Sequence, residues 1–250
     1  MKKIIFITLL SLMGSSVFSQ NTRLNDHNQI GWLGYFGTFK VSNKFSLHSE
    51  YQWRRDNYIA DKQQGLMRVG LNYQTTPKLQ LRLGYAWIET YPYGDFPING
   101  MGRDFTEHRI FQMATLTDKI SKFDLSQRFM LEQRFIGRYT NPTIRVEDDY
   151  LFLNRLRYMF RIQMPLKGKE VTNKTTYIAA YNEILIGFGK NVNENIFDQN
   201  RIGILLGYKF NNNFRVEGGY INQTVQLGRE IEQRNVFQNN NGFIVNTLIK

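Results

Sequence analysis

The chain has 250 residues, enough for one large domain, and carries a formal net charge of +11 at pH 7. It contains no cysteine, which excludes disulfides, zinc–thiolate sites and cysteine nucleophiles. Its mean hydropathy of −0.43 is too low for a protein built from several membrane-spanning helices. The basic residues are spread along the chain, so an anionic membrane surface is favoured over a nucleic acid as partner.

The first segment, 1–19, has the composition of a secretory signal peptide. Two lysines precede an apolar run over 4–13, and small or polar residues follow it. The apolar run is too short for a retained membrane anchor. We therefore expect cleavage before Gln20 and export of the mature chain, 20–250, as a single domain.

After this segment, apolar and polar residues alternate in almost every stretch between turns. In "NRLRYMFRIQM" (154–164), the large apolar residues Leu156, Tyr158, Phe160 and Ile162 hold even positions, and the arginines hold odd ones. On a helix the two kinds would mix around the axis, whereas on a strand they form two separate faces. The pattern predicts strands, and no amphipathic helix is expected.

Eleven segments show this strand pattern. They lie near 29–41, 45–56, 64–76, 79–90, 107–118, 122–136, 150–164, 175–188, 199–210, 213–227 and 237–249. Because single-chain bacterial barrels normally have an even number of strands, we expect ten to twelve, with twelve slightly favoured.

Short and long connections alternate between these segments. Short turns are expected at 42–44, 76–78, 119–122 and 211–213, with 166–174 as a longer member of the same set. Long loops are expected at roughly 56–63, 91–107, 137–149, 189–199 and 228–238. The sequence therefore predicts an all-β fold, an antiparallel up-and-down transmembrane barrel with short periplasmic turns and longer extracellular loops, of which 91–107 is an exposed recognition surface.

The predicted strands also have the dimensions and the flanking residues of membrane strands. Their apolar faces are about 9–11 residues long, enough to cross a bilayer when tilted. Aromatic residues flank both sets of connections, as in the two girdles of a membrane barrel. A soluble β-sandwich is the competing interpretation, and it would bury the apolar faces instead of turning them to lipid.

In a barrel the polar faces line the lumen. The predicted lumen network contains Glu50, Arg54, Arg68, Arg82, Arg128, Glu132, Arg134, Arg155, Arg157, Arg161, Glu183, Arg201, Arg215 and Glu217. We expect the glutamates to be held by arginines on neighbouring strands, Glu132 by Arg155 and Arg157 and Glu183 by Arg201. The network is interpreted as structural, and the surplus of arginine leaves an anion pathway as the alternative.

A catalytic role finds little support. The histidines are His27, His48 and His108. His48 shares a strand face with Ser46 and Glu50, but neighbours on one face lie about 7 Å apart, so a direct hydrogen bond is not expected. No nucleophile elbow and no metal-ligand cluster occurs. We therefore assign no catalytic, cofactor-binding or metal residue, and keep a lipid-modifying barrel enzyme as the alternative function.

Several segments are similar to a known family. "FMLEQRF" (129–135), "NRLRYMFRIQMPL" (154–166), "YNEILIGFG" (181–189), "FDQNRIGILLGYKF" (197–210) and "VEGGYINQ" (216–223) together resemble the family of domain of unknown function 2490, DUF2490. The resemblance implies an exported barrel in the outer membrane, with its lipid, lipopolysaccharide and the barrel-assembly machinery as partners. It implies no activity. One departure is the chain end "NTLIK", which lacks the terminal aromatic residue that often assists barrel assembly.

Overall fold

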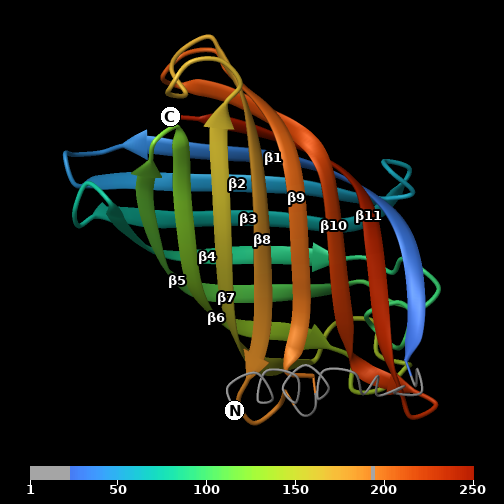
Figure 1. Ribbon diagram of the computed structural model, residues 1–250. Helices are drawn as coiled ribbons and strands as arrows, with labels where there is room; N and C mark the ends of the chain where they lie inside the picture. Colours follow the sequence, from blue (N-terminus) through green and yellow to red (C-terminus); the bar gives the residue numbers. More distant parts are fainter. Residues whose placement is uncertain (1–22, 193–194) are drawn as a thin grey trace, which may run out of the picture.

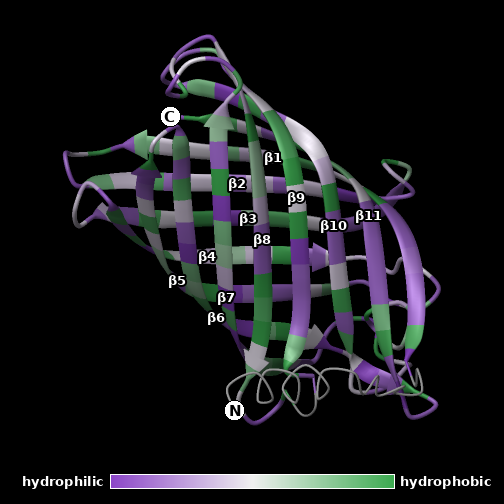
Figure 2. Cartoon of the chain, viewed as in Figure 1, coloured by the Kyte–Doolittle hydropathy of each residue, from purple (hydrophilic) through white to green (hydrophobic). Residues whose placement is uncertain are grey.

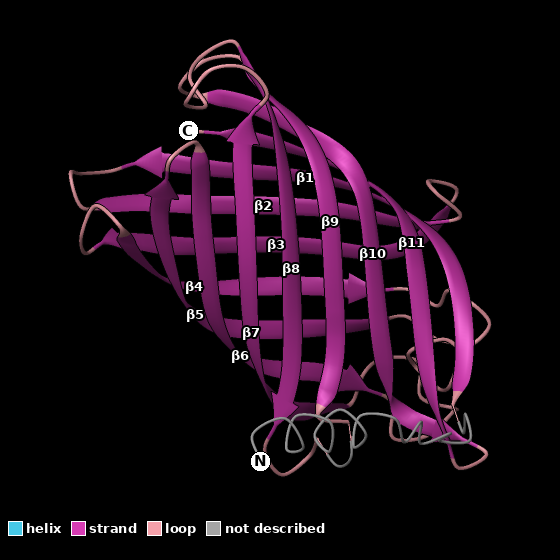
Figure 3. Cartoon of the chain, viewed as in Figure 1, coloured by secondary structure: helices cyan, strands magenta, loops and turns pink. Residues whose placement is uncertain are grey.

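The fold is known from a computed structural model that describes residues 23–192 and 195–250. The predicted signal peptide lies outside the described residues. In the described part every regular element is a strand (Figure 3). No helix there is long and apolar enough to cross a membrane.

Eleven strands follow one another along the chain. They are β1 (Leu24–Lys40), β2 (Phe45–Asp56), β3 (Asp61–Gln74), β4 (Leu79–Thr90), β5 (Phe105–Ile120), β6 (Phe123–Arg138), β7 (Asp149–Pro165), β8 (Thr175–Phe188), β9 (Phe197–Lys209), β10 (Phe214–Ile231) and β11 (Arg234–Ile249). Each strand pairs with its neighbours in sequence, and the sheet closes into one barrel (Figure 1). The predicted all-β barrel is confirmed.

The barrel closes through a parallel pair. β1 runs parallel to β11, with Leu24 opposite Val236 and Gly37 opposite Ile249. All other neighbouring strands in the described chain are antiparallel. An odd number of strands leaves the first and last strands pointing the same way, so this closure has to be parallel. Eleven strands lie within the predicted range of ten to twelve. The segment at 29–41 is a full barrel strand, which excludes ten, and the slight preference for twelve was wrong because the described residues form no twelfth strand.

The connections gather at two ends of the barrel. One end, called the turn end, carries 41–44, 75–78, 121–122, 166–174 and 210–213. The other, called the loop end, carries 57–60, 91–104, 139–148, 189–192 with 195–196, and 232–233. Two of the predicted long loops were wrong. The connection predicted at 56–63 is a turn of residues 57–60, and that predicted at 228–238 is a hairpin turn in which Glu232 and Gln233 both have positive φ, as a tight type I′ turn requires.

Large apolar side chains cover the outside of the barrel. Leu156 is 44% exposed, while the adjacent Arg155 on the same strand is 1% exposed and faces inward. Figure 2 shows the resulting bands of opposite hydropathy along the strands. The exposed apolar set includes Leu33, Leu47, Met67, Val69, Leu83, Ile110, Phe129, Phe160, Ile204 and Leu206. The alternation therefore turns its apolar face outward, and the soluble sandwich is excluded.

Candidate functional site in the barrel interior

The centre of the barrel holds a carboxylate enclosed by arginines. Glu132 on β6 is 0% exposed. Arg155 on β7 donates from Nε to Glu132 Oε2 at 2.7 Å, and Arg157 donates from Nη1 to Oε1 at 2.9 Å. Arg109 on β5 places Nη1 3.7 Å from Oε1. The pairing of β6 with β7, in which Glu132 lies opposite Arg155, brings these groups together.

A second enclosed carboxylate lies on β8, which is separated from β6 by β7. Glu183 on β8 accepts hydrogen bonds from Arg157 and Arg128, both with donor nitrogens 2.7 Å from Oε1. Arg201 on β9 lies opposite Glu183, and its Nη1 is 3.6 Å from Oε2. Arg157 therefore links Glu183 to Glu132.

A third pair lies on β2 and β3. Arg68 Nη1 donates to both oxygens of Glu50, at 2.9 and 2.8 Å. Both side chains are buried. We call the buried charged residues at mid-barrel the ion-pair layer: Glu50, Arg68, Arg109, Glu132, Arg155, Arg157 and Glu183. Buried Phe111, Met113 and Met130 pack in the same interior.

The other predicted lumen residues lie away from the middle of this layer or have neutral partners. Arg161 pairs with Glu217 at 2.6 Å toward the turn end, and Arg134 pairs with Glu107 at 2.5 Å toward the loop end. Three of the predicted lumen arginines form no ion pair with any described residue: Arg54, Arg82 and Arg215. Arg82 Nε donates to the neutral Asn72, and Arg54 donates to Gln52 and Gln64.

Several interior charged residues were not predicted from the sequence, among them Glu107, Arg109 and Asp198. Glu107 and Arg109 stand at the start of β5, where a loop edge was predicted. Asp198 lies at a register shift between β8 and β9, so simple alternation does not give its direction. Its Oδ2 accepts a hydrogen bond from Arg155 Nη1 at 2.5 Å. For Glu107, the one sequence signal of an inward direction was its place in the alternation of polar and apolar residues along the strand that follows.

The prediction that His48 forms no direct hydrogen bond with Glu50 was wrong. His48 Nε2 lies 3.1 Å from Glu50 Oε2, although the two residues are two apart on one strand. Both side chains lean along the strand and close the gap that the backbone spacing leaves. Ser46 Oγ instead accepts a hydrogen bond from Asn72. Among the described residues, no serine hydrogen-bonds to a histidine.

Two cavities lie on opposite sides of the ion-pair layer. The loop-end cavity has a volume of about 450 Å³ and is lined by residues that include Trp32, Arg155 and Arg201. The turn-end cavity, of about 660 Å³, is lined by residues that include Lys78, Arg161 and Arg215. The two cavities share no lining residue. Because Arg155 also binds Glu132, the ion-pair layer forms the floor of the loop-end cavity.

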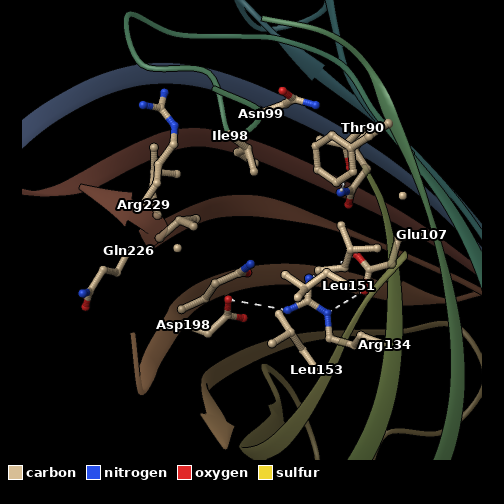
Figure 4. A pocket seen from close by; sticks show the side chains of 18 of the residues that line it. Thr90, Ile98, Asn99, Glu107, Arg134, Leu151, Leu153, Asp198, Gln226 and Arg229 are labelled. Carbon is tan, nitrogen blue, oxygen red and sulfur yellow. Dashed lines mark hydrogen bonds and ion pairs between the residues drawn. The ribbon is translucent and has the colours of Figure 1, made fainter. Parts of the chain in front are cut away.

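The loop-end cavity has a charged floor and apolar walls. Figure 4 shows Arg134 between Glu107 and Asp198 on the floor, with Leu151, Leu153 and Ile98 around the space. The lining residues include seven arginines and two carboxylates: Arg54, Arg109, Arg134, Arg138, Arg155, Arg201 and Arg229, with Glu107 and Asp198. The cavity surroundings are therefore strongly positive and can attract an anion.

The ring of Trp32 makes cation–π contacts with two of these arginines, Arg54 and Arg201. The ring lies beneath the guanidinium of Arg54, with Cζ 4.0 Å from the ring centroid, and Arg201 Cζ is 5.3 Å from the same centroid. Such cation–π contacts stabilise a guanidinium without neutralising it. Trp32 is itself fixed by a hydrogen bond from Nε1 to Gln63 Oε1 at 2.8 Å.

The connection 91–104 folds into the mouth of this cavity. Tyr93 is buried and donates to Gln238 Oε1 on β11 at 2.8 Å, and burial raises the pKa of Tyr93 to about 12. Arg229 Nη2 donates to the Pro97 carbonyl oxygen at 2.7 Å. Gly94 has φ +70°, and a Cβ there would collide with Asp26 Oδ2. The loop predicted to be an exposed recognition surface is therefore partly buried, because Tyr93 and Pro97 dock against β11 and β10.

No cluster of three or more potential metal ligands occurs in residues 23–192 and 195–250.

The fold and its interior define a closed β-barrel with a charged, largely filled lumen. The chain belongs to the family described as "Protein of unknown function (DUF2490)", whose model matches residues 29–234. Neither the comparison with curated proteins nor that with solved structures gave a match.

Proposed function

We propose that this protein is a non-catalytic barrel of the outer membrane that binds a ligand at its loop end and does not conduct. The exposed apolar outer surface supports a membrane position, because so large an apolar area on a closed barrel calls for a lipid environment. Outer-membrane lipid, lipopolysaccharide and the assembly machinery are its proposed partners.

The observation that carries the proposal is the packing of the ion-pair layer. Glu132 and Arg155 have almost no accessible surface, and neither does Phe111 beside them. A water-filled pore would leave such groups accessible from the lumen. The layer thus favours a barrel whose centre is closed and whose functional space is the loop-end cavity.

Conductance in a planar bilayer tests this proposal. The refolded protein should insert without producing stable current steps, while a general porin in the same bilayer gives the positive control. Insertion is verified by recovery of folded protein from matching liposomes. Reproducible ohmic steps from the folded protein would overturn the proposal and would support the anion-pathway interpretation of the lumen arginines.

A further inference from the structure

We propose that the loop-end cavity binds a small amphiphile that carries one anionic head group, a carboxylate or a phosphate, on a short alkyl chain. The head group lies at Arg54 and Arg201, and the chain lies along the apolar wall. This inference rests on the proposed function, because it requires a closed cavity floor and a ligand that enters from the loop end.

The floor has positive charge that its own carboxylates do not neutralise. Glu107 already accepts hydrogen bonds from Arg109 and Arg134, and Asp198 accepts one from Arg155. Arg54 and Arg201, the two lining arginines beside Trp32, form no hydrogen bond with either of these carboxylates.

Both arginines are buried, but Arg54 has no anionic partner among the described residues and Arg201 has only the longer ion pair with Glu183. Arg54 donates only to the neutral side chains of Gln52 and Gln64. Arg201 donates to Gln199, has an unpartnered buried Nε, and comes no closer than 3.6 Å to a Glu183 oxygen. A buried guanidinium without a carboxylate is unfavourable, and an anion in the cavity would offset that cost. The planar guanidinium suits carboxylate and phosphate oxygens equally.

The walls above the floor are suited to an alkyl chain. Ile98, Leu151, Leu153 and Leu227 line the cavity, and Figure 4 shows the first three around the open space. The volume of about 450 Å³ lies within the roughly 300–1,000 Å³ of typical small-molecule sites. A charged floor with apolar walls matches a molecule that has one anionic and one apolar end.

Trp32 provides a direct readout because it lies beside both arginines. We would replace the outward-facing Trp53 and Trp87 by phenylalanine, which leaves Trp32 as the single tryptophan of the chain. The protein is placed in phosphatidylcholine nanodiscs and titrated with 2-bromooctanoate, whose bromine quenches tryptophan at short range. Quenching should be saturable. Octanoate or octyl phosphate should reverse it, and the better competitor identifies the head group.

Octanol and octyltrimethylammonium are the matched controls for charge, and neither should reverse the quenching. Arg54→Gln should weaken probe binding about tenfold, equivalent to about 1.4 kcal/mol. Arg215→Gln is the matched control variant, because Arg215 also forms no ion pair but lines the turn-end cavity. Folding of each variant is checked by circular dichroism.

Three results would overturn the inference: quenching that does not saturate, equal reversal by octanol or by the cationic amphiphile, or unchanged binding in folded Arg54→Gln. These results are independent of conductance. A protein that neither conducts nor binds the probe would overturn this inference alone, whereas a conducting protein would overturn the proposed function.

Discussion

Arg155 and Glu132 form an ion pair in which both side chains are almost completely buried, at 1% and 0% exposure. They stand opposite each other on β7 and β6, and Arg155 Nε lies 2.7 Å from Glu132 Oε2. Arg155 also donates to Asp198 on β9. One arginine thus connects three strands across the lumen, which ties the closed centre of the barrel to the floor of the loop-end cavity.

Neutralising Glu183 should destabilise the barrel. In Glu183→Gln the arginines at 128, 157 and 201 lose their common carboxylate partner, and uncompensated buried charge typically costs about 3–5 kcal/mol. We expect a lower urea midpoint for unfolding from lipid vesicles. The control is Asp118→Asn, which removes a carboxylate from an exposed pair with Lys78 and should leave the midpoint unchanged. An unchanged midpoint in Glu183→Gln would show that the network is not structural.

A charge on the outer surface should be tolerated only near the barrel ends. Leu156 lies at the middle of β7 and points outward, so Leu156→Arg should cost about 2–4 kcal/mol if it faces the bilayer midplane. Val41→Arg, in the turn-end connection, should cost about 0–1 kcal/mol. Unfolding from vesicles measures both. Equal costs would contradict a lipid-facing belt.

The absence of cysteine allows the topology to be tested with single cysteines. Val146 is 74% exposed at the loop end, and Lys169 is exposed in the turn-end connection 166–174. A membrane-impermeant maleimide should label Val146→Cys on intact cells, and should label Lys169→Cys only after lysis. The opposite pattern would show that the loop end faces the periplasm.

Tyr93, the docked tyrosine of the 91–104 connection, should lose its phenol proton at a higher pH than an exposed tyrosine does. Burial raises the pKa of Tyr93 to about 12, above the ordinary value near 10 that it has in an unfolded chain. Docking is therefore fully favoured below pH 10 and is lost as the pH rises through 12. The difference in tyrosinate absorbance between wild type and Tyr93→Phe should develop near pH 12 in folded protein and near pH 10 in denaturant. A folded-state transition near pH 10 would mean that the loop is not docked.

The sequence predicted the architecture because period-2 alternation is independent of which strands pair. Alternation places Arg155 and Arg157 on one face and Leu156 on the other, and the barrel predicted from the connections then turns the arginines inward and Leu156 outward. The pairing of consecutive strands then places Glu132 opposite Arg155 and Glu183 opposite Arg201. Neither the facing directions nor these cross-strand pairs depend on the diameter of the barrel.

Features that depend on closure or on local backbone could not be predicted in this way. The parallel pairing of β1 with β11 follows from the odd number of strands. Eleven segments were recognised in the sequence, but the even number usual in bacterial barrels argued against an odd count. Asp198 sits at a register shift, where alternation fails. The cavity depends on side chains from eight or more separated segments, including Tyr93 of a connection whose docking has no periodic signal.

Methionine oxidation tests the closed, lipid-embedded barrel most directly, because the native chain carries the probes. Met101 is exposed at the loop end, Met67 points outward from β3, and Met130 is buried at mid-barrel. With the protein in a bilayer, a water-soluble oxidant should convert Met101 to the sulfoxide and spare Met67 and Met130, as read by peptide mass spectrometry. Oxidation of Met130 as fast as Met101 would reveal a water-filled lumen, and equally fast oxidation of Met67 would show that the outer surface does not face lipid.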